Sequence, residues 1–95
     1  MSGARSLAVR VTGRVQGVNY RNFTVAAARG LSVDGWVRNC DDGSVEAVLH
    51  GPGQALSNLV GIMRKGPPES GVHNLDVRSI DRGAATEPPA DAYVF

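Results

Sequence analysis

The sequence predicts an α+β fold in which an antiparallel sheet carries two helices on one face. Segments with the alternation of strands and segments with helical spacing follow one another in the order strand, helix, strand, strand, helix, strand. The two central strands are joined by Asp41-Asp42-Gly43, a short turn typical of a hairpin. The 95 residues have room for one hydrophobic core, so we expect residues 1–95 to form a single domain.

The first strand is expected over residues 7–12, where apolar and polar or small side chains alternate. A period of two is typical of a strand with one buried face, and Gly13 ends the pattern. The face toward the core would carry Leu7, Val9 and Val11. Residues 1–5 are mostly small or polar, and we expect them to be frayed.

The first helix is expected from Tyr20 to Leu31. Apolar side chains recur there at steps of three and four, which places them on one stripe: Tyr20, Phe23, Ala27 and Leu31. No Ser, Thr or Asp precedes the helix to cap it, so its first N–H groups need another partner. A bound anion would supply that partner, because a helix N-terminus carries a partial positive charge.

A hairpin is expected next, with strands from Asp34 to Cys40 and from Ser44 to His50. Trp36 is a bulky member of the first strand, and we expect it to lie in the core. The second strand alternates cleanly, and its core-facing side chains would be Val45, Ala47 and Leu49. Gly51-Pro52-Gly53 then breaks the strand and opens the next helix.

The second helix is expected from Gln54 to Arg64 and ends at the Gly66-Pro67-Pro68 loop. Its buried stripe would consist of Leu56, Leu59 and Met63. A fourth strand from Val72 to Asp81 follows, and a change of parity between Val77 and Ile80 predicts a bulge or a bend.

The chain is expected to close with an irregular loop over residues 83–91 and a short edge strand over residues 92–95. The complete order of elements is that of the ferredoxin-like split βαβ arrangement. Because this fold hosts many functions, it does not indicate one by itself.

Composition and charge exclude several classes of partner. The formal net charge is +1, so no broad basic surface suggests binding to nucleic acid or to a membrane. Cys40 is the only cysteine and cannot form an internal disulfide, which favours a reducing compartment. No apolar run approaches the roughly 20 residues of a membrane span, and no signal peptide is visible. We therefore expect a cytoplasmic protein. His50 and His73 lack the spacing of metal ligands with Cys or acidic residues, so we expect both to be surface or strand residues.

The segment GRVQGVNYR, residues 13–21, has the layout of an anion site made by the backbone. Its two glycines allow the chain to curl so that several N–H groups point inward. Arg21 falls at the start of the first helix, where the helix dipole disfavours a cation, and its planar fork suits phosphate oxygens. For the glycine pair taken alone, a tight turn between strand and helix is the simpler interpretation.

These motifs together resemble the acylphosphatase family. GRVQGVNYR is followed by Gly35-Trp36-Val37-Arg38-Asn39 and by Asp42-Gly43-Ser44-Val45-Glu46, and Gly51 and Gly66-Pro67-Pro68 match as well. The resemblance covers roughly residues 7 to 82, and the spacing from Arg21 to Asn39 agrees with the family's pattern.

The resemblance implies hydrolysis of a carboxyl–phosphate mixed anhydride without metal or cofactor. Arg21 would bind the phosphoryl group, and Asn39 would orient the attacking water. The main chain that wraps the phosphoryl oxygens would be that of Val15, Gln16, Gly17, Val18, Asn19 and Tyr20. The partners would be a small acyl phosphate and the product phosphate, and we expect a monomer. If the terminal strand runs beside this loop, the carboxylate of Phe95 would be able to pair with Arg21.

Three positions depart from the family's pattern. Asn19 stands where an aromatic or small apolar residue is usual and would change the outer wall of the phosphate site. Ser32 replaces a glycine after the first helix, which costs on the order of 1 kcal/mol if the backbone there is left-handed. Cys40 replaces a hydroxyl or aliphatic residue beside Asn39.

Two other functions remain open at this point. One is a phosphate-binding module that has lost turnover, for which Asn19 is the only support. The other is a ferredoxin-like RNA-binding module, which would display aromatic side chains on the open sheet face and a basic surface. Asn39 also has a simpler interpretation, as a turn-favouring residue ahead of the hairpin turn.

Overall fold

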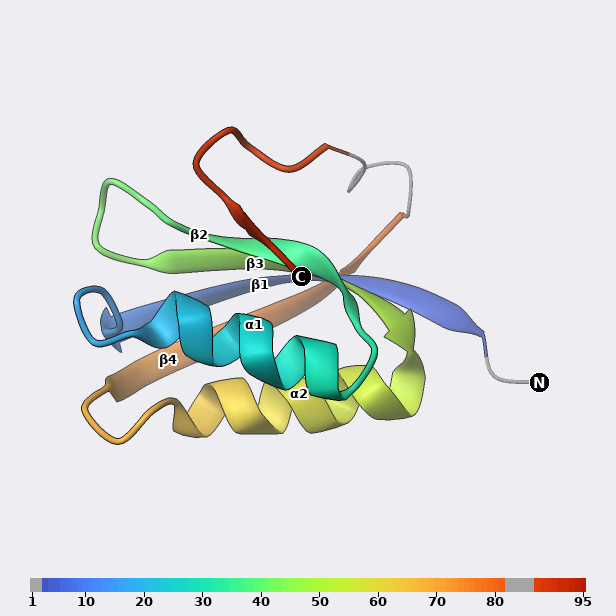
Figure 1. The fold of residues 1–95 in the computed structure, drawn as a ribbon, viewed down its shortest axis with the longest axis horizontal. Coiled ribbons are helices and arrows are strands. Elements are labelled where there is room, and N and C mark those ends of the chain that lie inside the picture. Colours follow the sequence, from blue (N-terminus) through green and yellow to red (C-terminus); the bar gives the residue numbers. More distant parts are fainter. Residues whose placement is uncertain (1–2, 82–86) are drawn as a thin grey trace.

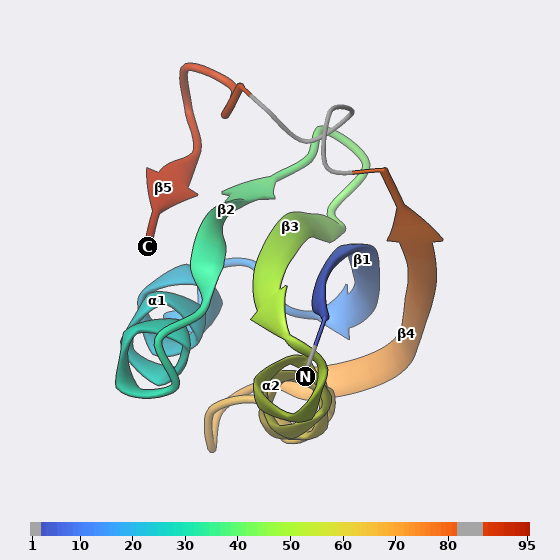
Figure 2. The same ribbon diagram turned by 90° about the vertical axis from the view of Figure 1, so that its right-hand side faces the viewer.

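A computed structural model describes residues 3–81 and 87–95 of the chain. Its elements are β1 (Ala4–Arg14), α1 (Tyr20–Gly30), β2 (Asp34–Asn39), β3 (Val45–Pro52), α2 (Gly53–Lys65), β4 (Gly71–Ile80) and β5 (Tyr93–Val94). The strands form one antiparallel sheet in the order β4-β1-β3-β2-β5. Both helices lie on the same face of this sheet (Figure 1, Figure 2). The predicted ferredoxin-like α+β fold is confirmed.

The core lies between the sheet and the two helices. The stripe predicted for α2 and the alternation predicted for β3 and most of β1 are confirmed, because these side chains are almost completely buried: Val9, Val11, Val45, Ala47, Leu49, Leu56, Leu59 and Met63. Leu7, predicted on the same face of β1, is only half-buried at the edge of this core. Trp36 is buried too, but strand alternation places its side chain on the face of β2 opposite to Val37 and the helices.

The predicted stripe of α1 is correct at Tyr20 and wrong by one position in the turns that follow. The buried side chains are Tyr20, Thr24 and Ala28, whereas Phe23 and Ala27 are only half-buried. Thr24 can take a core position because its hydroxyl donates to the carbonyl of Tyr20 at 2.9 Å, so no polar group is left unpaired. Hydrophobicity alone does not reveal that a local hydrogen bond makes a threonine acceptable in the core.

Two predicted irregularities are also corrected. Residues 4 and 5 are not frayed, because Ala4 and Arg5 pair with the end of β3. The irregularity on β4 does not fall between Val77 and Ile80, where pairing with β1 is continuous. It lies between Thr12 and Gly13 of β1, where the register shifts.

The end of the chain returns to the edge of the sheet beside β2. Of the loop predicted over residues 83–91, residues 83–86 lie outside the described residues. The terminal strand is shorter than predicted and pairs Tyr93 with Val37 and Val94 with Trp36. This register turns the Tyr93 side chain toward the helix side of the sheet, next to the start of α1.

Candidate active site

The loop between β1 and α1 lies at the same end of the sheet as the turn between β2 and β3 (Figure 1). A pocket of about 100 Å³ lies between this loop, the start of α1, the last residue of β2 and the edge strand β5. It is lined by Val15, Gly17, Asn19, Tyr20, Arg21, Asn22, Asn39 and Tyr93. The fold thus brings Arg21 and Asn39 to one pocket, as the sequence predicts.

The loop curls through two residues with positive φ. Gly17 has a φ of 75° and Asn19 a φ of 66°. Asparagine is one of the few residues other than glycine that tolerate this left-handed region, so the unusual Asn19 suits its backbone. Val15 is buried beneath the loop, whereas the side chains of Gln16 and Val18 do not line the pocket.

The first turn of α1 leaves its N–H groups available. The helix has no side-chain cap and no acidic residue in its first turn, and its first intrahelical bond runs from the N–H of Phe23 to the carbonyl of Asn19. The Oδ1 of Asn19 accepts instead from the Nδ2 of Asn22, at 3.0 Å. The first N–H groups of α1 therefore lie at the end of the helix beside the pocket and have no side-chain acceptor. This arrangement is suited to binding an anion.

Arg21 is held against an aromatic ring. Its guanidinium carbon lies 4.1 Å from the centroid of the Tyr93 ring, within the range of a cation–π contact. Among the described residues, Arg21 forms no ion pair. The suggested pairing with the terminal carboxylate is thus wrong: the N–H of Phe95 bonds to the carbonyl of Gly35, away from Asn39 along β2.

Asn39 is the last residue of β2, and its side chain lies on the helix side of the sheet with that of Val37. Its Oδ1 is buried and has no hydrogen-bond partner among the described residues. A buried acceptor without a partner costs about 1–3 kcal/mol, and such groups usually bind an ordered water or a ligand. Asn39 also lines the pocket, so its carboxamide lies beside the space that a bound group would occupy.

Tyr20 fixes the inner wall of the pocket to the second helix. Its hydroxyl donates to the carbonyl of Met63 at 2.7 Å, in a fully buried position. Burial raises the pKa of this phenol above its usual value, so Tyr20 stays neutral and keeps its donor. This contact anchors α1, and with it Arg21, to the body of the protein.

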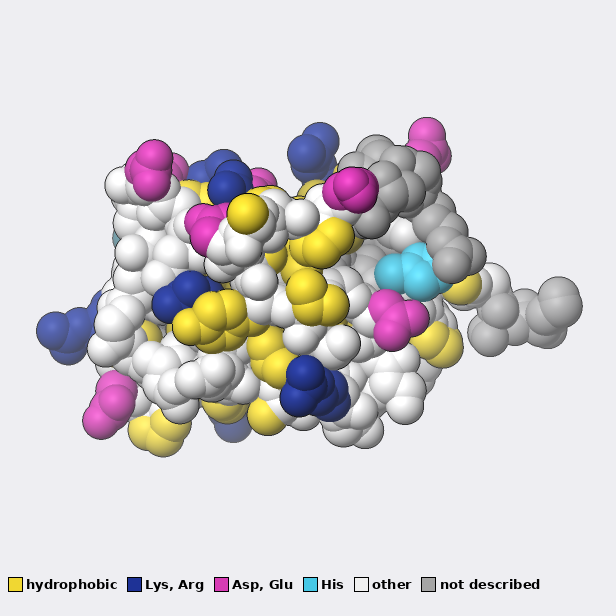
Figure 3. Space-filling model, turned by 45° about the horizontal axis from the view of Figure 1, so that its top comes forward, with side chains coloured by type: hydrophobic (Ala, Val, Ile, Leu, Met, Phe, Trp, Pro, Cys, Tyr) yellow, Lys and Arg dark blue, Asp and Glu magenta, His cyan; other side chains and the backbone are white. Residues whose placement is uncertain are grey.

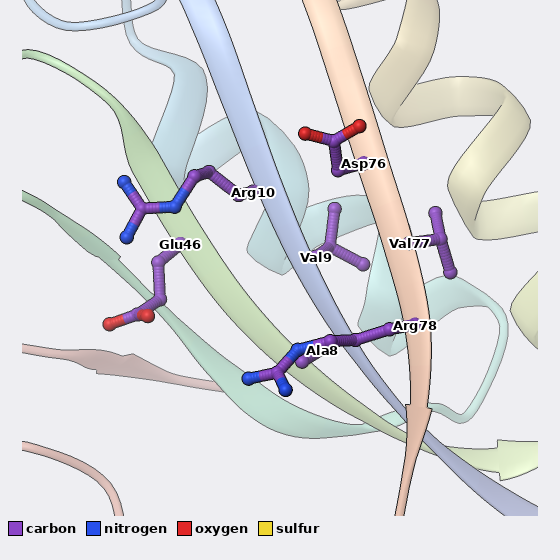
Figure 4. Close-up of a pocket in the computed structure, with 7 residues that line it drawn as sticks. All are labelled: Ala8, Val9, Arg10, Glu46, Asp76, Val77 and Arg78. Atoms are coloured by element: carbon purple, nitrogen blue, oxygen red, sulfur yellow. The ribbon is translucent and has the colours of Figure 1, made fainter.

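A larger hollow on the other face of the sheet has a different character. It measures about 250 Å³, and Figure 4 shows Arg10, Glu46, Asp76 and Arg78 among its lining side chains. Two cations and two anions leave it without a preference for either sign. Figure 3 likewise shows acidic, basic and hydrophobic side chains interspersed over one face of the molecule. The pocket beside Arg21 has a cation and no carboxylate in its lining, so it is the better candidate for an anion.

The pocket contains two residues that the sequence interpretation missed. Asn22 is a polar residue next to Arg21 in the first helical turn, and this position could have identified it as a candidate for the pocket lining. Tyr93 is distant from Arg21 in sequence, and nothing in the sequence connects the two. Within residues 3–81 and 87–95, no group of three or more His, Cys, Asp or Glu could hold a metal ion, and no helix is long and apolar enough to cross a membrane.

The chain matches known proteins over most of its length. The family model described as Acylphosphatase matches residues 7–87. An acylphosphatase of Rhodospirillum rubrum is 47% identical over 80% of this chain and 84% of its own length. The acylphosphatase crystal structure from Bacillus subtilis has a TM-score of 0.79 and 37% identity, covering 82% of this chain and 86% of that one. An acylphosphatase structure from Coxiella burnetii has a TM-score of 0.80 and 32% identity, covering 93% and 88%.

Proposed function

We propose that Arg21 and Asn39 have separate roles in the active site of this chain, which belongs to the acylphosphatase family and hydrolyses acyl phosphates to a carboxylate and inorganic phosphate. Arg21 and the main-chain amides of residues 15–20 hold the phosphoryl group. Asn39 orients the attacking water. The observation that carries this proposal is that Asn39, whose buried Oδ1 has no hydrogen-bond partner among the described residues, lines the same small pocket as Arg21.

The phosphoryl group is held by charge and by main-chain donors. The curled loop and the uncapped start of α1 offer N–H groups, and the Arg21 guanidinium adds a permanent charge with several donors. In phosphoryl transfer the protein contributes mainly positioning and charge stabilisation, and these groups supply both. The Tyr93 ring supports the guanidinium from one side.

Asn39 supplies the acceptor that a water needs beside the phosphoryl group. Its Oδ1 accepts a hydrogen bond from the water and turns the water's lone pair toward phosphorus. The P–O bond to the carboxylate breaks as the bond from water forms, and the carboxylate leaves with the electron pair. The protons of the water stay on the product phosphate. A carboxylate is a stable leaving group near neutral pH, so a dedicated general acid is unnecessary. A carboxamide does not titrate, so it performs this role over a wide pH range.

We also propose that the reaction needs no metal ion and that the protein works as a cytoplasmic monomer. The pocket lining contains no carboxylate, thiol or imidazole, and the single cysteine forms no internal disulfide. The alternative of a phosphate-binding module without turnover rested only on the unusual residue type of Asn19. That residue type has a simpler explanation, because asparagine tolerates the left-handed backbone at this position and its Oδ1 accepts a hydrogen bond from Asn22.

The experiment is benzoyl phosphate hydrolysis in the presence of EDTA, with wild-type protein and with Arg21→Ala. The wild type should turn over at the same rate with and without EDTA. Arg21→Ala should lose phosphate binding and turnover together, by about three orders of magnitude or more in turnover. A rate that falls with EDTA and returns with a divalent cation would refute the metal-free mechanism. Phosphate binding retained by Arg21→Ala would refute the role of Arg21.

A further inference from the structure

The side chain of Gln16 joins the phosphate loop to the strand end that carries Asn39. Its Nε2 donates to the carbonyl of Cys40 at 2.8 Å and to the carbonyl of Ser44 at 2.9 Å. Both bonds are partly buried and span 24 and 28 residues of sequence. A carboxamide nitrogen has two N–H donors, so this one uses both on the base of the β2–β3 turn.

The two carbonyls lie on either side of that turn. The N–H of Cys40 also donates to the carbonyl of Ser44 at 2.8 Å, which closes the base of the turn. Cys40 directly follows Asn39 in the chain. A hydrogen bond that holds the carbonyl of Cys40 therefore also restrains the backbone next to Asn39. On the other side, Gln16 lies between Val15 and Gly17, which line the pocket.

Neither carbonyl depends on Gln16 alone for a hydrogen bond. Cys40 also accepts from the N–H of Gly43 at 3.1 Å, and Ser44 accepts from Cys40. Removing the Gln16 donors therefore leaves both acceptors paired, and the loss of stability should be small. What is lost is the direct connection between the phosphate loop and the end of β2.

We propose that Gln16 is a positioning residue that fixes the distance between the bound phosphoryl group and the water-orienting Asn39. This inference rests on the proposed roles of Arg21 and Asn39. It adds a function for the Gln16 side chain, whereas the phosphate site uses only the main chain of that residue. Because a misplacement of about 1 Å can reduce a rate by about a hundredfold, a side chain outside the pocket can still control turnover.

The test is a double-mutant cycle with Gln16→Leu and Asn39→Ala, measured as kcat for benzoyl phosphate and as the inhibition constant of inorganic phosphate. Leucine has similar bulk and no donors. In the wild-type background Gln16→Leu should lower kcat by roughly tenfold and change phosphate affinity less than about twofold. In the Asn39→Ala background it should lower kcat no further, because the residue that Gln16 positions is already absent.

Two further variants make the result decisive. Gln16→Asn keeps the donors but shortens the side chain by one methylene, and it should behave as Gln16→Leu does. Gln54→Leu changes the only other glutamine, which lies exposed on α2 and bonds to Asn58, and should leave kcat unchanged. Thermal unfolding of each variant establishes that it is folded.

Three results would overturn the proposal: an unchanged kcat in both Gln16 variants, the same fractional loss of kcat with and without Asn39, or a loss confined to phosphate affinity. The proposed function is judged separately, because it depends on the single variants of Arg21 and Asn39. If Asn39→Ala alone has no effect on kcat, the proposed role of Asn39 is wrong. The single variant shows this before the coupling with Gln16 is considered.

Discussion

The guanidinium of Arg21 rests on the face of the Tyr93 ring, with its central carbon 4.1 Å from the ring centroid. Arg21 is the second residue of α1, and Tyr93 lies on the short strand at the edge of the sheet. The ring occupies one face of the guanidinium and leaves its in-plane N–H groups able to reach a phosphoryl group in the pocket. The aromatic face thus orients the cation and leaves its charge in place, whereas a carboxylate would neutralise that charge.

Replacing Tyr93 with Leu should weaken phosphate binding, because the guanidinium loses its support. Cation–π contacts at such partly exposed sites contribute about 0.5–1 kcal/mol, which corresponds to about a two- to fivefold weaker inhibition by phosphate. Tyr93→Phe should bind phosphate as the wild type does, since phenylalanine keeps the aromatic face. Inhibition of benzoyl phosphate hydrolysis by phosphate measures the effect.

The control for this prediction is Val94→Thr on the same strand. Val94 pairs with Trp36 and points to the opposite face of the sheet from Tyr93, so it tests the strand without touching Arg21. Its phosphate affinity should equal that of the wild type. Equal weakening in the Phe and Leu variants of Tyr93 would show that the aromatic face is not what matters.

Ser32 has a left-handed backbone, with a φ of 57°, as its departure from the family's glycine suggested. Ser32→Gly should stabilise the protein by about 1 kcal/mol, because glycine adopts this conformation without a steric cost. Urea unfolding measures the change, and kcat should stay the same. Ser57→Gly, in the exposed part of α2, should have the opposite sign and destabilise by about 0.5 kcal/mol. A destabilised Ser32→Gly variant would contradict the assignment of strain.

Asp42 gives the hairpin turn a dependence on pH. Hydrogen bonds from the Ser44 hydroxyl and N–H, with Arg10 nearby, lower the pKa of this carboxyl below its usual value. A lowered folded pKa means that the stabilisation is present above the unfolded value of about 4 and is lost as pH falls through the folded pKa. Asp42→Asn should therefore be less stable than the wild type at pH 7, and the difference should disappear in strong acid.

Urea unfolding at both pH values tests this, with Asp41→Asn as the control in the same turn. The Asp41 carboxylate forms no hydrogen bond or ion pair among the described residues, and that variant should follow the wild type at both pH values. A difference for Asp42→Asn that persists unchanged in strong acid would rule out the ionised carboxylate as its cause.

The sequence predicts the order of elements because the strands and the second helix carry clear periodic patterns. The predicted side chains of β3 and α2 are buried, whereas Val77 of β4 is exposed. It misplaces the buried stripe of α1 because a hydroxyl–carbonyl bond lets Thr24 enter the core. It misplaces the irregularity of β4 because a bulge depends on pairing with β1, which a single strand's pattern does not encode.

The site shows the same division. Arg21 and Asn39 could be predicted because motifs close to each residue in sequence mark them, and the fold places both at one pocket. Tyr93 could not, because it lies beyond residues 7–87 of the family match and reaches Arg21 only through the register of β5 with β2. The side-chain bonds of Gln16 likewise depend on the packing of two segments that are separate in the sequence.

The roles of Arg21 and Asn39 are separated most directly by phosphate affinity and kcat measured together in Asn39→Ala, with Asn74→Ala on the exposed part of β4 as a control. We expect Asn39→Ala to lower kcat by roughly two to three orders of magnitude, the effect of losing one donor or acceptor used in the transition state. Phosphate should inhibit this variant as it inhibits the wild type, within about twofold. A kcat close to the wild-type value, or a loss of phosphate binding as severe as the loss of turnover, would show that Asn39 does not act by orienting the water.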